Sequence, residues 1–412
     1  MAGPMKAWRF VLRPQEPEAP RSRRQRMALS PHRLEKTPVS LVVAASARVL
    51  AESGRKGDIG LLAIDQYGDE DTRKASQALI RAESREGGLD PEQVIAAMEI
   101  LDPKREAQVL LGGGLDSHPE LIVAIAEQRT LLGNSPDLFK QLKDPQACFP
   151  LLDTLGIPYP DVCWQCPGET ASWLLKTGCS EGGKGVRFSA HDQPGPGDYY
   201  QRRLAGSTYS VLFLANGDAL KIIGFNTLQT LAAGKTPFLF AGAMNFTDLQ
   251  TDVRRAVAAF ALKLVRKTGL VGLNSLDFMI DPLKGPLVLE INPRPSATMA
   301  LYDRDAPHGL LRAHIQAAGG DLMPIPATTH FRAFHVVLAT RHIVASTAQV
   351  WPSWAHDRPS VGSSVMAGTP FCTVEAEASS PRRALKLLMR RIGHLKTLMD
   401  TAMQTPSFSY PV

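Results

Sequence analysis

Short apolar runs alternate with helical segments in the first part of the chain. Three runs stand out, Val39–Ala45, Gly60–Asp65 and Gln108–Gly112, and small or turn-forming residues bound them. Continuous apolar runs of this length are typical of strands that are buried on both faces. We expect helices over residues 74–84 and 119–128. Because strands alternate with helices, the pattern predicts a doubly wound parallel sheet in an α/β domain.

Helical and strand signals are mixed in the rest of the chain. A helix over 136–155 is followed by short strands, glycine-rich turns and a longer helix over 251–268. The apolar runs 274–280 and 287–291 flank the turn Asp281–Pro286, whose Pro and Gly residues predict a hairpin. This mixture predicts an α+β region after the α/β domain.

The changes in pattern divide the chain into four parts. They are a basic arm (1–36), the α/β domain (37–132), a two-lobed central region (133–325) and a small β-rich carboxy-terminal module with a final helix (326–412). The 412 residues are 44% hydrophobic and 21% charged, as in ordinary globular proteins. A chain of this length and composition buries a large core without disulfides or a structural metal.

The net charge of +6 lies entirely in the arm. Residues 1–36 hold nine Lys or Arg and three Glu, whereas the remainder has 37 basic and 37 acidic residues. Arginine and proline without apolar periodicity favour a disordered arm, and Met27 is an alternative start. The neutral body does not favour nucleic acid as a partner.

Hydropathy and cysteine content indicate where in the cell the protein resides. No apolar run approaches the roughly 18 residues of a membrane span. The N-terminus lacks the apolar core of a secretory signal. The 5 cysteines are odd in number and scattered, which indicates reduced thiols. We therefore expect a cytoplasmic protein with no membrane partner, and the oligomeric state stays open, a homodimer included.

Oxygen-bearing side chains gather on the predicted hairpin. Glu290 and Asn292 lie two residues apart on one strand, so their side chains share a face, and Asp277 lies on the partner strand. A few hard oxygen ligands suit Mg²⁺ when phosphate oxygens complete its shell. Arg294 follows in the same phase, where a guanidinium can hold a phosphoryl or carboxylate group. The alternative is a polar edge of the hairpin that faces water. However, Glu290 interrupts an otherwise apolar strand, and a buried carboxylate without a partner is costly.

A glycine-rich segment lies earlier in the chain. Gly182, Gly183 and Gly185 allow backbone N–H groups to approach phosphates, and Lys176 and Lys184 add positive charge. The spacing is neither that of a Walker loop nor that of a dinucleotide-binding fingerprint. Taken alone, the segment is better explained as a plain surface turn.

Together the glycine loop and the hairpin resemble the ATP-grasp superfamily, over about residues 39–399. Leu289–Pro295 is the most specific match, in which Glu290 and Asn292 correspond to metal ligands and Asp277 to the partner acid. The resemblance implies an ATP-grasp fold, with the α/β domain ahead of two nucleotide-binding lobes and the β-rich module after them.

The same resemblance assigns the nucleotide contacts. Lys140 corresponds to the first nucleotide lysine, with nearby Lys143 as a rival, and Lys176 to the second. Lys221 lies on a segment similar to the strands under the phosphates, where it is a candidate phosphate contact. The remaining nucleotide contacts belong to a flexible lid and to a hinge that contacts adenine, where many members carry a glutamate in place of the glutamine. These are Gly182, Gly183, Lys184 and Gly185 in the lid, and Gln201, Arg203 and Leu204 in the hinge.

The resemblance implies ATP-dependent ligation. A substrate carboxylate attacks the γ-phosphate, which gives an acyl phosphate and ADP, and an amine then displaces phosphate. The expected cofactors are ATP and two Mg²⁺ ions, with Mn²⁺ as a substitute, and the metal ligands are Asp277, Glu290 and Asn292. Arg294 and Lys221 are the catalytic candidates because they can stabilise the transferring phosphoryl group.

The expected partners are a small-molecule carboxylate and an amine. The segment Glu290–Thr298 looks closest to enzymes that join glutamate to tyramine while building furan-type one-carbon cofactors. Two alternatives stay open. One is an ATP-grasp carboxylase or phosphotransferase, since biotin-dependent carboxylases also append a carboxy-terminal module. The other is a non-catalytic nucleotide-binding regulatory protein, which the intact acid set argues against.

Overall fold

The structure of the chain is a computed structural model that describes residues 39–189, 194–346 and 350–401. The basic arm expected over residues 1–36 lies outside the described residues.

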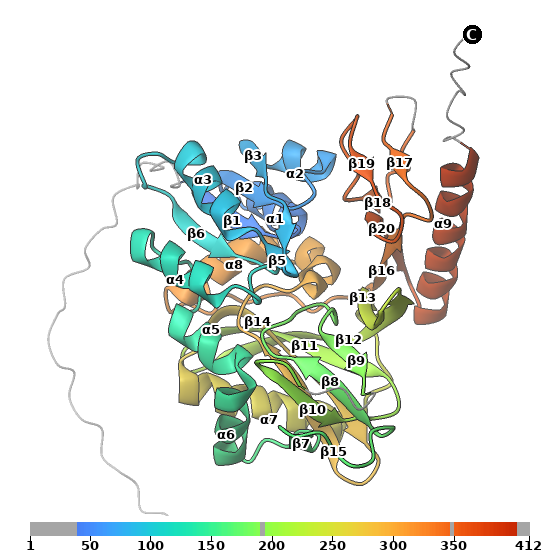
Figure 1. Ribbon diagram of the computed structural model, residues 1–412. Helices are drawn as coiled ribbons and strands as arrows, with labels where there is room; N and C mark the ends of the chain where they lie inside the picture. Colours follow the sequence, from blue (N-terminus) through green and yellow to red (C-terminus); the bar gives the residue numbers. More distant parts are fainter. Residues whose placement is uncertain (1–38, 190–193, 347–349, 402–412) are drawn as a thin grey trace, which may run out of the picture. The chain divides into compact units, whose positions relative to one another are not determined.

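A four-stranded parallel sheet forms the N-terminal domain (Figure 1). Its strand order is β3–β2–β1–β6, with β1 at Ser40–Ala44, β2 at Leu61–Asp65, β3 at Ala78–Arg81 and β6 at Gln108–Leu111. Its helices are α1 (Arg48–Lys56), α2 (Glu70–Ala75), α3 (Pro91–Leu101) and α4 (Pro119–Gln128), and a small hairpin pairs β4 (Ser84–Arg85) with β5 (Gly88–Leu89). The prediction of a parallel sheet is confirmed.

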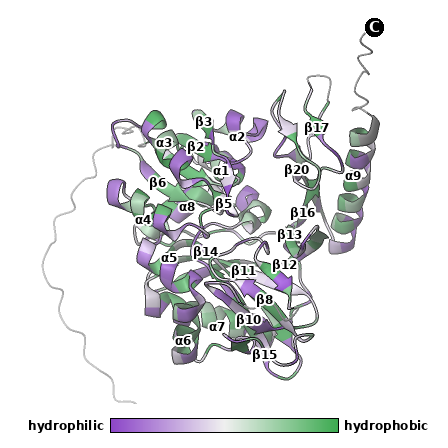
Figure 2. Ribbon diagram, in the orientation of Figure 1, coloured by the Kyte–Doolittle hydropathy of each residue, from purple (hydrophilic) through white to green (hydrophobic). Residues whose placement is uncertain are grey.

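Both faces of this sheet are covered, as the continuous apolar runs indicate. Val42 of β1 packs in the cluster that contains Leu311 of α8 (Gly309–Ala318). The next residue, Val43, points to the opposite face and packs in the cluster that contains Val94 of α3. Figure 2 shows the result, with hydrophobic colouring on β6 and hydrophilic colouring on much of α2.

The helix expected over residues 74–84 is wrong. α2 begins after Asp69, whose carboxylate accepts hydrogen bonds from two backbone N–H groups of the first turn, and ends at Ala75. The chain then forms β3, which pairs in parallel with β2 and places Ala78 opposite Leu62. Strand pairing outweighs local helix propensity at this edge of the sheet.

The central region begins with two helices and a second sheet. The helices are α5 (Pro136–Lys143) and α6 (Pro145–Leu155). The sheet is antiparallel in the order β7–β10–β8–β9, with β7 at Val162–Cys163, β8 at Trp173–Thr177, β9 at Val186–Phe188 and β10 at Asp198–Arg202. The loop between β8 and β9 is the glycine-rich segment.

An eight-stranded antiparallel sheet spans the rest of the described chain. Its order is β15–β14–β11–β12–β13–β16–β20–β18. The strands are β11 (Thr208–Asn216), β12 (Leu220–Ala233), β13 (Thr236–Met244), β14 (Val271–Asp281), β15 (Gly285–Asn292), β16 (Phe331–Leu338), β18 (Ala355–His356) and β20 (Pro370–Ala378). The hairpin expected around Asp281–Pro286 is confirmed as β14–β15.

Helices cover this sheet on both faces. Val257 of α7 (Thr251–Thr268) packs with Phe213 of β11 on one face, and Leu310 of α8 packs with Leu212 on the other. The remaining elements are the short helices η1 (Ala297–Leu301) and η2 (Asp303–Asp305), the strand pair β17 (Ile343–Val344) and β19 (Ser364–Val365), and the final helix α9 (Pro381–Thr401). Strands β16, β18 and β20 thus continue the large sheet, and α9 lies beside β16 and β20.

Candidate active site

The strand pair β14–β15 brings the three oxygen-bearing side chains together. Asp277 lies directly opposite Glu290, and Asn292 lies two residues further along β15. The Nδ2 atom of Asn292 is 3.5 Å from Oδ2 of Asp277. Burial and the Glu290 carboxylate raise the pKa of Asp277. Two carboxylates this close to each other favour a cation between them.

The ammonium group of Lys143 lies among these oxygens. Lys143 is the last residue of α5 and is buried. Its Nζ donates to Asn292 Oδ1 at 3.0 Å, forms an ion pair with Glu290, and lies 2.7 Å from Asp116 Oδ2. Burial lowers the pKa of Lys143, but the carboxylates of Asp116 and Glu290 outweigh burial and hold this pKa above its ordinary value. The site is therefore built to hold positive charge.

The donor set of the hairpin fits Mg²⁺ in the presence of phosphate. Asp277 and Glu290 supply hard carboxylate oxygens, and Asn292 supplies a carbonyl oxygen that already accepts from a cation. In the described part of the chain, no group of three or more His, Cys, Asp and Glu is arranged to hold a metal. Two carboxylates and one amide would thus need phosphate oxygens to complete the shell, which is the arrangement that Mg²⁺ prefers.

Arg294 lies next to this site and is held by two carboxylates. Its Nε and Nη2 atoms donate to Asp116 at 2.9 and 2.8 Å, and Nη2 also donates to Glu181 Oε2 at 2.8 Å. Asp116 follows β6 in the N-terminal domain and is fully buried, and Arg294 and Lys143 hold its pKa far below its ordinary value against the effect of burial. The two oxygens of Asp116 fix the guanidinium and the ammonium in place.

The glycine loop covers this cluster. Gly182 and Gly183 have positive φ angles of 61° and 75°, and a Cβ on Gly183 would lie 1.9 Å from the carbonyl oxygen of Phe238. The Gly182 carbonyl accepts from the N–H of Phe240 at 2.9 Å, and Lys184 Nζ donates to the carbonyl of Gly87 at 2.9 Å. The loop therefore contacts β13 on one side and the β4–β5 hairpin on the other.

The hinge residues lie on and after β10. Lys176 Nζ donates to Gln201 Oε1 at 3.3 Å. Gln201 is 3% exposed, and its Nε2 atom has no hydrogen-bond partner among the described residues. A buried amide without an acceptor is costly, so this group suits a polar ligand such as a purine ring. Arg203 stacks over Phe188 at 5.1 Å from its ring centroid, and Leu204 is half-buried.

The structure does not bring Lys140 or Lys221 to the carboxylates. Lys140 is exposed on α5, and its rival Lys143 takes the position beside Glu290. Lys221 pairs with Leu214, whereas Asp277 pairs with Ser210 of the same strand, four residues away. That spacing corresponds to roughly 13 Å along the strand. Lys140 and Lys221 are thus less well placed for the transferring phosphoryl group than Lys143 and Arg294.

Two acidic residues of the cluster were missed in the sequence. Asp116 and Glu181 both lie in loops, where no periodicity marks a side chain that turns inward. The signal available for Asp116 is its place just beyond Gly112–Gly114, because ligands in open parallel sheets bind outside the carboxyl ends of the strands. Glu181 has no comparable signal beyond its position inside the glycine loop.

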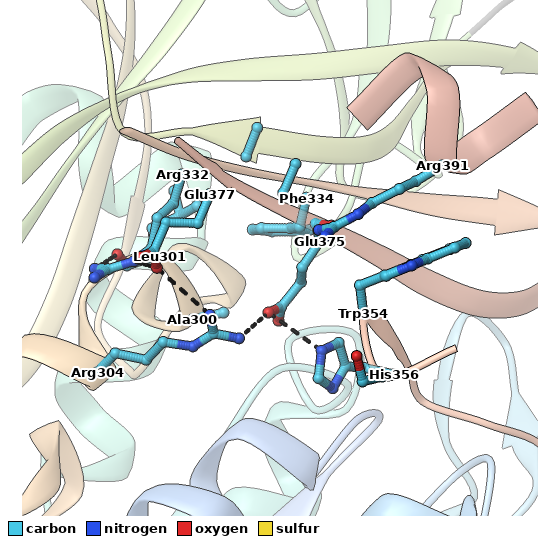
Figure 3. A pocket seen from close by; sticks show the side chains of 13 residues that line it. Ala300, Leu301, Arg304, Arg332, Phe334, Trp354, His356, Glu375, Glu377 and Arg391 are labelled. Carbon is cyan, nitrogen blue, oxygen red and sulfur yellow. Dashed lines mark hydrogen bonds and ion pairs between the residues drawn. The ribbon is translucent and has the colours of Figure 1, made fainter. Parts of the chain in front are cut away.

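A separate cavity of about 250 Å³ lies between η1, β16, β20 and α9 (Figure 3). Arg304 and His356 both point toward Glu375 in this cavity, and Arg391 lies over the ring of Trp354. None of the predicted site residues lines this cavity.

Among the described helices, none is both long enough and apolar enough to cross a membrane.

Comparison with known proteins agrees with the resemblance to ATP-grasp enzymes. Residues 142–298 match the family described as an ATP-grasp domain. No curated protein sequence matches the chain. Many solved structures match the chain, and three that resemble it over most of its length represent them.

The first is a pyruvate carboxylase from Rhizobium etli, with a TM-score of 0.68 and 16% identity over 88% of this chain, which spans only 39% of that enzyme. The second is a biotin carboxylase–ATP complex from Campylobacter jejuni, with a TM-score of 0.67, 14% identity, and coverage of 90% of this chain and 96% of that chain. The third is an N5-carboxyaminoimidazole ribonucleotide synthetase from Thermus thermophilus, with a TM-score of 0.62, 14% identity, and coverage of 87% and 98%. At these identities the likeness is one of fold.

Proposed function

Because residues 142–298 match an ATP-grasp domain, we propose that this chain belongs to the ATP-grasp superfamily and is an ATP-dependent ligase that joins a small carboxylic acid to an amine. The observation that most supports this proposal is the convergence of Glu290, Asn292, Lys143 and Arg294 beneath the glycine loop. Acid oxygens, cations and loop amides at one point are the groups that phosphoryl transfer requires.

Each group has a distinct role in the proposed reaction. Asp277, Glu290 and Asn292 would hold Mg²⁺, which would supply positive charge to the phosphate oxygens when bound. Lys143, whose ammonium group lies among these oxygens, would contact a phosphate of the nucleotide. Arg294 contacts the transferring phosphoryl group or the acid that receives it, and its bidentate pairing with Asp116 keeps it oriented.

The nucleotide is held between the two sheets of the central region. Lys176 contacts a phosphate, and the backbone amides of the glycine loop contact the others. The unpaired Nε2 of Gln201 donates to the adenine ring, with the backbone of Arg203 and Leu204 beside it. The closed loop excludes water, which would otherwise hydrolyse the intermediate.

The chemistry proceeds in two balanced steps. A carboxylate oxygen of the acid bonds to the γ-phosphorus while the bond from that phosphorus to the bridging oxygen breaks, and ADP leaves. The amine nitrogen then bonds to the acyl carbon, the acyl–oxygen bond breaks, inorganic phosphate leaves, and the amine loses a proton. No side chain of the protein has to form a covalent bond.

The resemblance of the Glu290–Thr298 segment to ligases that join glutamate to tyramine makes these two compounds the first substrates to test, in a pathway to a one-carbon cofactor. A second candidate is carboxylation, because the structural neighbours include carboxylases and match this chain over most of its length. In that case bicarbonate takes the place of the carboxylic acid.

An ADP-release screen tests the proposal. The chain is incubated with ATP and Mg²⁺ against amino acids paired with amines, with L-glutamate plus tyramine as one pair and bicarbonate as a separate arm. ADP release that requires an acid and an amine together supports the ligase. Release that requires bicarbonate supports the carboxylase, and ATP binding without turnover in any arm contradicts both.

A Glu290→Ala variant is the matched control for this screen. The variant removes a ligand of the metal from the edge strand, so we expect turnover to fall by roughly 100-fold or more. The melting temperature should stay close to that of the wild type because Glu290 is half-buried. Near-normal turnover in this variant would exclude Glu290 from the metal site.

A further inference from the structure

The carboxylate of Glu181 lies in a cradle that has the chemistry of a carboxylate-binding site. Its Oε2 accepts from Arg294 Nη2 at 2.8 Å, and the carboxylate also accepts from the backbone N–H of Gly114. The Glu181 and Arg294 side chains are only 11% and 8% exposed. A guanidinium and a backbone N–H together are a strong and oriented pair of donors for a planar anion.

Glycine makes room for the anion in this cradle. A Cβ on Gly113 would lie 3.2 Å from Glu181 Oε2 and 3.4 Å from Arg294 Nη1. The first distance is shorter than an ordinary contact and the second is at the lower limit of one, so a side chain at this position would press mainly on the carboxylate. The absence of a side chain at Gly113 thus shapes the floor of the cradle.

The surroundings of Glu181 are unfavourable for a second negative charge. Its carboxylate is buried close to that of Asp116, and both effects raise its pKa although Arg294 lowers it. Asp116 already uses both oxygens to hold Arg294. Arg294 therefore has a committed partner without Glu181, and Glu181 accepts from the same Nη2 atom that donates to Asp116.

Glu181 also belongs to a loop that has to open. It lies between β8 and β9, next to Gly182 and three residues before Lys184. In the proposed function the nucleotide lies beneath this loop, so the loop has to move away for the nucleotide to enter. When Glu181 moves with the loop, the guanidinium of Arg294 and the N–H of Gly114 become available to another anion.

We propose that Glu181 is an internal occupant of the carboxylate subsite, and that a free carboxylate or bicarbonate binds there by displacing it and releasing the loop. The inference rests on the proposed function, because it identifies where the acid of that reaction binds. The carboxylate subsite consists of Arg294, Gly113 and Gly114, with Asp116 as a positioning residue for Arg294. The shared ligand chemistry is a planar anion with two oxygens.

Binding of labelled small anions tests this proposal without any turnover. The line width of ¹³C-labelled acetate or bicarbonate is measured against protein concentration, at constant ionic strength set with chloride. If Glu181 fills the subsite for nine-tenths of the time, its removal should tighten the apparent affinity about ten-fold. We therefore expect Glu181→Ala to bind acetate or bicarbonate about ten-fold more tightly than the wild type. Glu181→Gln, which keeps the shape and loses the charge, should show a smaller gain.

Further variants separate this subsite from a general effect of charge. Adding Gly113→Ala or Arg294→Gln to Glu181→Ala should abolish the gain, because each removes part of the cradle. Glu127→Ala, on an exposed position of α4, should bind as the wild type does. The melting temperature of each variant shows whether it is folded, and Glu181→Gln serves if Glu181→Ala is not.

Release of the loop gives a second readout. Trypsin cleavage after Lys184 should accelerate when acetate or bicarbonate is added to the wild type, and should be fast in Glu181→Ala without either anion. Equal binding of both anions by the wild type and Glu181→Ala, or cleavage that neither anion changes, would overturn the proposal. Anion binding without ADP release in the substrate screen would instead contradict the proposed function and leave this inference standing. Tighter binding of acetate than of bicarbonate would identify an organic acid as the ligand, and the reverse order would identify bicarbonate.

Discussion

At the scale of single residues, buried His314 links the stability of the fold to pH. Its Nδ1 accepts from the N–H of Leu273 at 2.8 Å, and its Nε2 donates to the carbonyl of Leu132 at 2.9 Å. Burial lowers its pKa to about 4. The unfolded chain therefore takes up a proton first as the pH falls. The stabilisation is present above about pH 6.5, the ordinary value, and is lost towards pH 4.

We expect about 2 kcal/mol of stability to be lost at this histidine between pH 7 and pH 5. The urea midpoints of the wild type and of His314→Gln measure it at both pH values. Glutamine can both donate and accept a hydrogen bond but does not titrate, so the wild type should lose more stability than the variant. Equal losses in the two proteins would mean that His314 does not stay neutral in the fold.

The two lysines of α5 give a second prediction at this scale. Lys143→Met should lower ADP release by roughly 100-fold, because Glu290 and the nucleotide both lose a cation. Lys140→Met should leave ADP release within about two-fold of the wild type, as expected of an exposed side chain outside the site. Steady-state rates of ADP release at saturating ATP, measured for both variants and the wild type, show which lysine belongs to the site. A large loss in Lys140→Met with little loss in Lys143→Met would restore the sequence-based assignment.

The sequence predicts some residues of the site but not all of them. The period of two in a strand predicts that Glu290 and Asn292 lie on one face, and in the structure both side chains contact Lys143. Lys140 and Lys143 both lay within reach on one helix, and only the packing of α5 distinguishes them. The contacts of Asp116 and Glu181 with Arg294 could not be foreseen, since Arg294 is 178 and 113 residues away from them.

At the scale of elements, the glycine loop offers a matched pair of substitutions. Gly183→Ala should displace the loop, because its Cβ would meet the Phe238 carbonyl at 1.9 Å, whereas a Cβ on Gly182 meets nothing within 4 Å. Both positions have positive φ, so both variants carry a backbone cost of about 1–2 kcal/mol. The difference between them therefore isolates the contact with β13.

We expect ADP release to fall more than about ten-fold in Gly183→Ala relative to Gly182→Ala, because a misplaced loop misaligns the groups beneath it. Melting temperatures of the two variants should agree closely, since the loop contributes little to the core. The comparison of rates and melting curves for both variants provides the measurement. Equal rates would show that the contact between the loop and β13 has no part in closure.

Elements with strong local patterns were predictable, and an edge element was not. The buried strand β1 and the β14–β15 hairpin carry their own signals, in the continuous apolar run and in the turn residues. The segment after Ala75 carries a helical signal but forms β3 instead. Its conformation depends on pairing with β2, which local propensity does not report.

At the scale of the whole described chain, the carboxy-terminal strands also contact the N-terminal domain. Asp357, which follows β18, pairs with Arg48 of α1 at 2.7 Å, although the two are 309 residues apart. Next to it, Nε of Arg358 donates to Asp71 Oδ1 of α2 at 3.0 Å. The sequence predicted a small separate module for this region. These ion pairs and the continuous large sheet could not be read from local patterns.

Two arginines that share Glu375 test how much these contacts contribute. Arg48 is 5% exposed and pairs with Asp357, Glu52 and Glu375, whereas Arg304 is 52% exposed and pairs with Glu375 at 2.5 Å (Figure 3). Arg48→Met takes the buried guanidinium away from the partly buried carboxylates of Asp357 and Glu52, so we expect it to cost about 2–3 kcal/mol. Arg304→Met removes a solvent-screened pair and should cost at most about 1 kcal/mol. Urea unfolding followed by circular dichroism measures both. Equal costs would mean that solvent reaches Arg48, and that the carboxy-terminal strands are held mainly by the continuous sheet.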